Sequence, residues 1–255
     1  MEYPFERALV TGASSGIGEA MVDRLASSGV PVVVVARRED RLAKLAERHG
    51  GIEVLTADLT TDDGRGAVVE RIERGGIDLV VNNAGFGSSG DFYDLDPDRV
   101  ADEVDLNVAA LTRLSHAALS TMVPAGRGYL LNVSSIASFQ PAPRLAVYAA
   151  TKAFVTSLSE SLHEEVKRHG VHVTALCPGL TRTEFVSVSN TEQYADRFPG
   201  FAWMSPELVA KVGLADVVAN RALSVPGTQY KAATAISNVT PRWLRRRASG
   251  MVQRG

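Results

Sequence analysis

The sequence predicts a single α/β domain, in which a doubly wound parallel sheet carries helices on both faces. Short apolar runs alternate along the chain with segments of helical spacing, which is the pattern of strand–helix–strand units. The runs are continuous rather than alternating, as expected for strands buried on both faces of a parallel sheet. With 255 residues, 22 Gly, 11 Pro and no linker-like stretch, the chain fits one domain spanning residues 1–255.

Six apolar runs are the expected strands, and three longer segments are expected to be helices. The strands are expected at residues 7–11, 31–36, 52–57, 77–81, 129–133 and 171–177. The helices are expected at residues 97–120, 147–169 and about 205–224. The last helix has a clear start, because Ser205 suits the N-cap and Pro206 the first helical position. Ligands of such sheets bind beyond the carboxyl ends of the strands, so functional residues are expected just after them.

The segment from about residue 184 to 204 lacks this periodicity. Aromatic side chains gather there among polar and turn residues: Phe185, Tyr194, Phe198, Phe201 and Trp203. We interpret it as a lid over a core formed by residues 1–183, followed by a C-terminal helix, strand and basic tail at residues 205–255. A lid of this composition favours an apolar substrate. The alternative, that these side chains fill a subunit contact or the core, has equal weight.

Charge and composition exclude several classes of function. The 27 basic and 29 acidic side chains give a net charge of −2, which argues against nucleic-acid binding. The longest apolar run, residues 30–36, is too short to cross a bilayer, and the N-terminus resembles no signal peptide, so the cytoplasm is the expected compartment. One cysteine, Cys177, cannot form an internal disulfide, and the scattered histidines predict no metal site.

A glycine-rich turn follows the first expected strand and runs directly into helical residues. It reads Thr11-Gly12-Ala13-Ser14-Ser15-Gly16-Ile17-Gly18. Glycines allow the backbone to approach a ligand closely, and the N-terminus of the next helix offers unpaired N–H groups to a pyrophosphate. The residues that would hold it are Gly12, Ser14, Ser15, Gly16, Ile17 and Gly18. Taken alone, the spacing fits an empty structural turn equally well.

The end of the second strand indicates which dinucleotide would bind. An acidic residue there would bind the ribose 2′-OH of NAD(H), whereas the 2′-phosphate of NADP(H) requires cations. The strand ends in Ala36, followed by Arg37 and Arg38, so NADP(H) is favoured over NAD(H). The alternative is that both arginines begin a solvated helix face. Asp58 and Leu59, after the third strand, are candidates for adenine contact, although Asp58 is nearly as well explained as a helix N-terminal charge.

Tyr148 and Lys152 lie four residues apart at the start of an expected helix, and therefore share one face. An ammonium about 4 Å from the phenol is worth about 4 kcal/mol at an effective dielectric of 20, or nearly three pK units, which desolvation opposes. We expect this to bring the pKa of Tyr148 toward neutral, where the phenol can exchange a proton with an alcohol or carbonyl. Ser134 and Ser135 follow the fifth strand, and either hydroxyl could hold that oxygen. By itself the pair also fits an exposed Tyr–Lys contact.

Taken together, these motifs resemble the short-chain dehydrogenase/reductase family over residues 7 to about 183. The glycine-rich turn resembles the cofactor turn of the family, and the spacing of Tyr148 and Lys152 matches its Tyr-x-x-x-Lys motif. Two further segments match as well, Asn82-Asn83-Ala84-Gly85 after the fourth strand and Pro178-Gly179-Leu180-Thr181-Arg182-Thr183 after the sixth. The resemblance implies a Rossmann-like fold.

The resemblance also implies residue roles. Ser135, thirteen positions before the tyrosine, would polarise a carbonyl, and Tyr148 would be the general acid/base. Lys152 would bind the nicotinamide ribose and lower the pKa of the tyrosine, and Asn107 would bend its helix and hold a water on the proton path. The remaining cofactor contacts implied are Asn83, Ala84, Gly85, Pro178, Gly179, Leu180, Thr181 and Thr183.

The expected function is hydride transfer between NADP(H) and an apolar ketone, aldehyde or secondary alcohol. The alternatives are a catalytically silent NADP(H)-binding sensor or scaffold, and a nucleotide-sugar epimerase or dehydratase. The family resemblance also implies a homodimer or homotetramer. The C-terminal tail is basic, with Arg242, Arg245, Arg246, Arg247 and Arg254. We weigh peripheral membrane contact through residues 242–247 against a solvated tail, and favour the solvated tail.

Overall fold

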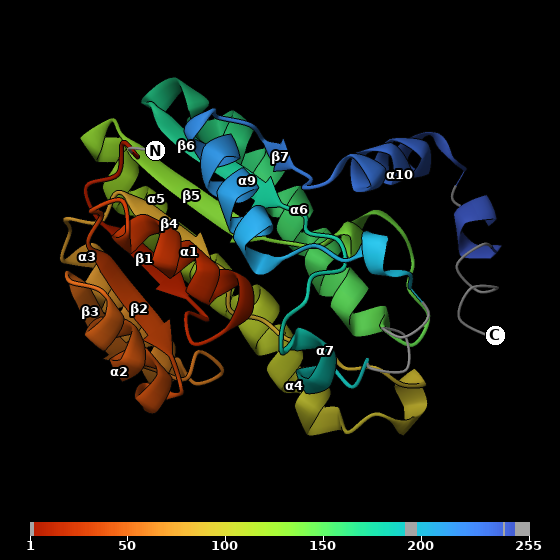
Figure 1. The fold of residues 1–255 in the computed structure, drawn as a ribbon. Coiled ribbons are helices and arrows are strands. Elements are labelled where there is room, and N and C mark those ends of the chain that lie inside the picture. The colour runs from red at the N-terminus through yellow and green to blue at the C-terminus, as the bar shows by residue number, and fades with distance from the viewer. Residues whose placement is uncertain (1–2, 192–197, 242, 248–255) are drawn as a thin grey trace.

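The computed structural model describes residues 3–191, 198–241 and 243–247 (Figure 1). In this part of the chain, seven parallel strands form one sheet in the order β3-β2-β1-β4-β5-β6-β7. Their bounds are β1 Ala8–Thr11, β2 Val32–Ala36, β3 Ile52–Thr56, β4 Leu79–Asn82, β5 Gly128–Val133, β6 Val171–Leu176 and β7 Leu223–Ser224. The predicted Rossmann-like α/β fold is confirmed, and all six predicted strands are present within two residues of their expected ends.

The two faces of the sheet are covered by two separate apolar layers. One layer packs Val10 and Val34 of the sheet against α1 (Gly16–Ala26), α2 (Glu39–Arg48) and α9 (Pro206–Val218). The opposite layer packs Leu9 and Val33 against α3 (Asp62–Glu73), α5 (Leu111–Ala125) and α6 (Ala146–Val166). Because neighbouring valines and leucines point to opposite faces, each strand has to be apolar throughout, which explains the continuous runs.

The order of the strands reverses at the centre of the sheet. β1 pairs with β2 on one side and with β4 on the other. The chain therefore leaves β1 and β4 in opposite directions, and a crevice opens beyond their carboxyl ends. The glycine-rich turn follows β1 and the Asn-Asn-Ala-Gly segment follows β4, so both predicted motifs border this crevice.

The predicted helix at residues 97–120 is one continuous helical rod with an irregular centre. It consists of α4 (Pro97–Val104), the π-helix η2 (Asp105–Ala110) and α5, which ends at Gly126 in the left-handed conformation. The rod begins where Asp96 accepts a hydrogen bond from the backbone N–H of Asp98. Its wide turn is centred on Asn107, the residue that the family resemblance places at a bend. The helix predicted at residues 147–169 is α6 followed by the short turn η4 (Lys167–His169).

The prediction for the C-terminal region is partly wrong. The helix expected to run to about residue 224 ends at Val218, and Leu223 and Ser224 instead form β7 beside β6. This change of direction is held by Asp216, which accepts a hydrogen bond from the Ser224 hydroxyl at 2.6 Å and pairs with Arg221 at 3.0 Å. A further helix, α10 (Thr228–Val239), was not predicted and extends away from the sheet (Figure 1).

The predicted lid contains two short helical segments in its described part, α7 (Phe185–Val188) and η5 (Gly200–Ala202). Of its aromatic side chains, Tyr194 lies outside the described residues, and Phe201 is 81% exposed. Two other short turns, η1 (Phe92–Asp94) and η3 (Ile136–Phe139), follow β4 and β5. In the basic tail, residues 243–247 are helical, whereas Arg242 and residues 248–255 lie outside the described part. No helix in the described ranges has the length and apolar character needed to cross a membrane.

Candidate active site

The glycine-rich turn and the segment after β4 are locked together at the mouth of the crevice. The side chain of Asn83 donates hydrogen bonds to the carbonyls of Thr11 and Gly12, at 2.9 and 3.2 Å. In return, the Thr11 hydroxyl accepts from the backbone N–H groups of Asn83 and Ala84, at 2.9 and 3.0 Å. A methyl group at Gly18 would lie 2.3 Å from the Gly12 carbonyl oxygen, so this close packing requires glycine.

The turn leaves the N-terminus of α1 directed at the crevice. Gly12 and Gly16 have φ angles of +64° and +60°, which glycine adopts without strain. Ser15 is the N-cap residue of α1, but its side chain accepts no hydrogen bond from the first turn. The first N–H groups of this eleven-residue helix are thus left without that cap, and the positive end of its dipole faces the crevice.

The two arginines after β2 differ in their contacts. Arg38 reaches back to the glycine-rich turn and donates to the hydroxyl of Ser14 at 2.9 Å and to that of Ser15 at 2.9 Å. Arg37 is more exposed and lies 3.7 Å from Asp58. Partial burial raises the pKa of Asp58, but the hydrogen bonds that it accepts from the N–H and hydroxyl of Thr60, together with the nearby Arg37, outweigh this and lower the pKa. Leu59 is buried beside it.

Ser134 and Ser135, which follow β5, have different roles in the structure. The hydroxyl of Ser134 donates to the carbonyl of Lys152 at 2.8 Å and contacts the hydroxyl of Thr156 at 2.7 Å, so it faces α6. Ser135 caps η3, accepting a hydrogen bond from Ala137, and its hydroxyl lies close enough to Tyr148 to lower the pKa of the phenol. The structure thus brings Ser135, and not Ser134, to the tyrosine.

Lys152 is buried beneath Tyr148. Its ammonium donates to the carbonyl of Val133 at 2.8 Å and lies 5.8 Å from the centre of the Tyr148 ring. Burial lowers the pKa of Lys152 to about 8. At Gly85 an added methyl group would lie 3.3 Å from the ammonium and 2.7 Å from the amide oxygen of Asn107, so a glycine here allows the lysine and asparagine to approach the crevice together.

The expected acidic shift of Tyr148 is wrong in this structure. Residue 148 as a whole is only partly buried, but desolvation at its hydroxyl raises the pKa to about 12, and the hydrogen-bonding contribution of Ser135 is too small to reverse this. The buried Glu103 adds a negative charge that raises the pKa further. Helical spacing places Lys152 near the ring, as predicted, but its ammonium is directed to a backbone carbonyl.

Asn107 holds the loop after β4 from inside the π-helix. Its amide nitrogen donates to the carbonyl of Phe86 at 2.8 Å and to the hydroxyl of Thr151 at 3.1 Å. Its amide oxygen accepts from the N–H of Phe86 at 3.2 Å. The Asn107 side chain therefore links the helical rod, the loop after β4 and Thr151 of α6, which is the residue before Lys152.

The Pro-Gly segment after β6 closes the other side of the crevice. The Pro178 carbonyl accepts from Ile136, the Leu180 N–H donates to the hydroxyl of Tyr230 at 3.1 Å, and the Thr181 hydroxyl donates to the Gly179 carbonyl. The side chain of Thr183 lies against the glycine-rich turn, because a methyl group at Gly16 would come within 2.9 Å of it. All predicted cofactor-contact segments therefore meet at one edge of the sheet.

The comparison with known proteins accounts for this arrangement. The family model of the short chain dehydrogenases matches residues 6–194. The chain belongs to this family. It is therefore an NAD(P)-dependent oxidoreductase of the short-chain dehydrogenase/reductase type.

Individual family members resemble the chain over most of its length. An uncharacterized oxidoreductase of Staphylococcus epidermidis is 36% identical over 181 residues, covering 69% of this chain and 78% of that protein. A short-chain dehydrogenase from Sphingobium yanoikuyae in complex with NADPH matches with a TM-score of 0.82 and 32% identity, covering 91% of this chain and 93% of that one. A bulky-bulky ketone specific alcohol dehydrogenase from Comamonas testosteroni has a TM-score of 0.77 and 30% identity, with 93% and 95% covered.

The residues of this short-chain dehydrogenase fit a nucleotide cofactor. An uncapped helix N-terminus and a close-packed glycine turn suit a pyrophosphate, and the cations after β2 suit an adenosine phosphate. Within the described ranges, no group of three or more His, Cys, Asp or Glu side chains could hold a metal ion.

Sequence reasoning missed three residues at this site. Tyr230 of α10 packs over Gly179 and donates a hydrogen bond to the Ala202 carbonyl at 2.6 Å. Glu184 pairs with Arg38, and Glu103 of α4 is fully buried with neither carboxylate oxygen hydrogen-bonded in the described structure. Burial raises the pKa of Glu103, against the opposing influence of Ser88, Arg99 and Lys152. The sequence marks Glu103 only as an acidic residue within the apolar pattern of the predicted helix at residues 97–120.

Proposed function

We propose that this chain is an NADP(H)-dependent carbonyl reductase, reversible to alcohol oxidation, that acts on apolar ketones or aldehydes. The observation that carries the proposal is the juxtaposition of Ser135 with Tyr148, above the buried Lys152, at the carboxyl edge of the sheet. A proton donor beside a second hydroxyl is the arrangement that a developing alkoxide requires.

In the proposed mechanism the cofactor, when bound, supplies or accepts the hydride. The hydroxyl of Ser135 holds the substrate oxygen, and the hydroxyl of Tyr148 gives its proton to that oxygen as negative charge develops there. With a pKa of about 12, the phenol is protonated at neutral pH and is ready to act as an acid. Lys152 holds a positive charge below pH about 8 beneath the ring, where it would hold the ribose. Asn107 fixes the loop at Phe86 that borders them.

Preference for NADP(H) is supported by the residues at the end of β2. Ala36 supplies no carboxylate for a ribose 2′-OH, and Arg38 is already directed toward Ser14 and Ser15 of the turn. The related dehydrogenase of Sphingobium yanoikuyae was solved with NADPH, and a related protein of Beutenbergia cavernae, described as a putative NAD(P) dependent gluconate 5-dehydrogenase, with NADP at low occupancy. An arginine is well suited to the 2′-phosphate, because its planar donors match phosphate oxygens.

An apolar substrate is supported by the surroundings of Tyr148. The ring of Phe185 packs against the ring of Tyr148, and we assign the described parts of the predicted lid, residues 184–191 and 198–204, as a cover over the site. Residues 192–197 of the predicted lid lie outside the described part of the chain. The neighbour from Comamonas testosteroni is specific for bulky-bulky ketones, which is consistent with this choice. We further expect two or four copies to associate through α5 and α6, where Phe154 of α6 is 40% exposed.

The proposal is tested by following NADPH and NADH consumption in parallel against a panel of carbonyl compounds. The panel contains 3-oxoacyl thioesters, a steroid ketone, aromatic diketones and an aldose. We expect turnover with NADPH on an apolar ketone, and loss of nearly all of it in Tyr148→Phe with the affinity for NADPH changed by no more than a few fold. Turnover that persists in Tyr148→Phe would reject the mechanism, and tight NADPH binding without any turnover would favour a sensor.

A further inference from the structure

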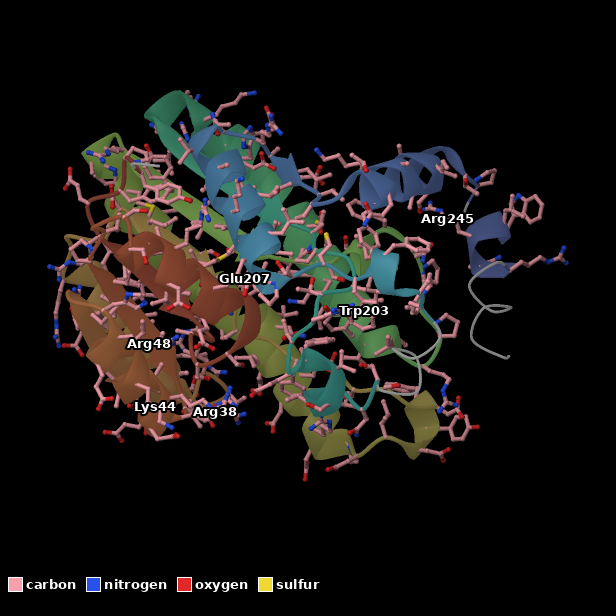
Figure 2. All side chains as sticks on the ribbon, viewed as in Figure 1. Arg38, Lys44, Arg48, Trp203, Glu207 and Arg245 are labelled. Carbon is pink, nitrogen blue, oxygen red and sulfur yellow. The ribbon has the colours of Figure 1, made fainter. Side chains whose placement is uncertain are left out.

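The carboxylate of Glu184 is held between two arginines at the adenosine end of the crevice. One oxygen accepts a hydrogen bond from Arg38 at 2.8 Å, and the other accepts from Arg41 at 2.6 Å. Together these bonds lower the pKa of Glu184 to about 2, so the carboxylate is charged at any pH at which the protein would be studied. Arg38 is labelled in Figure 2 near the start of α2, and Arg41 lies within the first turn of that helix.

Arg38 is also one of the two arginines after β2 that would receive a 2′-phosphate, and Arg41 lies three residues further along α2. Arg38 joins Glu184 to the hydroxyls of Ser14 and Ser15 in the cofactor turn, and so spans the distance from the turn to the carboxylate. A carboxylate bridging two guanidinium groups satisfies the donors that a phosphate monoester would otherwise use. A 2′-phosphate carries more negative charge and more acceptor oxygens than a carboxylate, and both anions on one arginine pair would repel each other.

Glu184 also begins the part of the lid that covers Tyr148. The next residue, Phe185, starts α7 and has its ring centre 5.1 Å from that of Tyr148. The far end of α7 is tied to the loop after β4, because the Ser189 hydroxyl accepts a hydrogen bond from the N–H of Gly87 at 2.9 Å. The arginine pair therefore anchors one end of a short helix whose body lies on the proposed acid.

We propose that Glu184 is a specificity-determining residue that competes with the cofactor 2′-phosphate for Arg38 and Arg41. Entry of the phosphate displaces the carboxylate and frees the near end of α7, whereas NAD(H), which lacks this phosphate, leaves the anchor in place. Binding of the phosphate at the adenosine end thereby changes the anchoring of α7 over Tyr148, because Glu184 directly precedes Phe185 in the chain. This inference rests on the NADP(H) preference in the proposed function.

The test compares two adenine nucleotides that differ in the 2′-phosphate alone. Binding of adenosine 2′,5′-bisphosphate and of 5′-AMP is measured by calorimetry in the wild type and in Glu184→Gln. Glutamine keeps the size of the side chain but removes its charge, so the bisphosphate no longer has to displace an anion. We expect Glu184→Gln to bind the bisphosphate about 3- to 10-fold more tightly than the wild type does, and 5′-AMP within about twofold.

A matched control is available near the start of β3, at the opposite end of the strands from the crevice. Glu53 also lies between two arginines, Arg71 at 2.6 Å and Arg7 at 3.4 Å, and is 43% exposed against 39% for Glu184. Glu53→Gln removes one paired carboxylate of similar exposure, and is expected to change neither affinity by more than about twofold. A general effect of the net charge would instead tighten bisphosphate binding in both variants.

Release of the lid is measured by hydrogen exchange of the backbone amides from Phe185 to Ser189. In the wild type, the bisphosphate should accelerate exchange in this segment, and 5′-AMP should not. In Glu184→Gln, exchange should be fast before any nucleotide is added.

The outcomes separate this inference from the proposed function. Weaker or unchanged binding of the bisphosphate by Glu184→Gln, in a protein whose wild type discriminates between the two nucleotides, overturns the competition and leaves the NADP(H) preference intact. Failure of both proteins to discriminate overturns the competition and the NADP(H) preference together. Discrimination that emerges only in Glu184→Gln supports the competition and overturns the NADP(H) preference of the wild type.

Discussion

The ring of Phe185 lies against the ring of Tyr148, with centres 5.1 Å apart and planes tilted by 50°. This contact covers part of the ring of the proposed acid with the first residue of α7. Desolvation is the main cause of the raised pKa of Tyr148, and Phe185 is one apolar group packed against its ring.

The pH dependence of the two reaction directions should differ. Reduction uses the protonated phenol, which persists up to the pKa of about 12, whereas oxidation requires the phenolate. We therefore expect the rate of alcohol oxidation to rise continuously from about pH 7 to 10, with no fall in reduction from the phenol itself over this range. Initial rates at saturating cofactor measure both profiles. A plateau in the oxidation rate from about pH 7 would contradict a phenol of high pKa.

Phe185→Ala should shift the oxidation profile. Removing the ring admits water to the phenol, which reduces the desolvation and lowers the pKa of Tyr148. The same oxidation rate should then be reached at a lower pH than in the wild type. Val188→Ala, at an exposed position of the same helix, is the control and should leave the profile unchanged.

Arg38 and Arg37 should contribute unequally to cofactor choice. Arg38 donates a hydrogen bond to Ser14 of the cofactor turn at 2.9 Å. The Arg37 side chain is 68% exposed, and its ion pair with Asp58 is longer, at 3.7 Å. We expect Arg38→Leu to raise the KM for NADPH by about tenfold or more with little change for NADH, and Arg37→Leu to have a smaller effect. Steady-state kinetics with both cofactors decides this. A larger effect of Arg37→Leu would place the phosphate on the outer arginine.

Glu103→Gln should stabilise the protein at alkaline pH. Burial raises the pKa of Glu103 above its value in the unfolded chain, so ionisation of this carboxyl favours the unfolded state. Stability is therefore lost as the pH rises from the unfolded pKa through the folded pKa. The amide removes this penalty, and we expect about 1–3 kcal/mol more free energy of unfolding than the wild type at pH about 8. The difference should nearly vanish at pH about 4.

Urea unfolding of both proteins at the two pH values measures this difference. Asp102→Asn, at the exposed neighbouring position, is the control and should change the free energy of unfolding by less than about 0.5 kcal/mol. Equal differences in the free energy of unfolding at both pH values would show that ionisation of Glu103 does not contribute to the pH dependence of stability.

Two glycine substitutions should have opposite effects. A methyl group at Gly18 would lie 2.3 Å from the backbone oxygen of Gly12, so Gly18→Ala should lower the free energy of unfolding by about 1–3 kcal/mol and weaken NADPH binding. At Gly66 in α3 no atom lies within 4 Å of the added methyl group. Gly66→Ala should raise the stability by roughly 0.5–1 kcal/mol. Thermal unfolding and NADPH titration check both, and a harmless Gly18→Ala would contradict the close packing of the turn.

Local patterns in the sequence predicted the elements of the sheet well. Each buried strand is a short apolar run that can be recognised on its own, and the motifs around Gly16 and Asn83 follow such runs directly. A strand was expected after the C-terminal helix, but the residues of β7 could not be located, because two residues are too few for a pattern and their pairing with β6 is a contact between distant parts of the chain.

Features that depend on burial or on contacts between distant parts of the chain could not be predicted from the sequence. Spacing placed Lys152 on the same helix face as Tyr148, but it could not show that desolvation would dominate the pKa of the phenol. Likewise, Arg38 and Glu184 are 146 residues apart and meet only through the fold. The roles of the predicted site residues stay predictions until the variants above are measured.

The wide turn at Asp105–Ala110 has a consequence for the engineering of this protein. A π-helix holds one more residue in its turn than an α-helix does, so it is equivalent to a single-residue insertion that the rod has absorbed. The extra residue is taken up within the turn, so α4 and α5 keep nearly the phase of one regular helix. Deleting one residue there would restore regular winding and leave Glu103 of α4 buried, but it would remove the wide turn from which Asn107 reaches Phe86 and Thr151. One surplus residue therefore lets the rod hold this loop without changing the direction in which its two halves face.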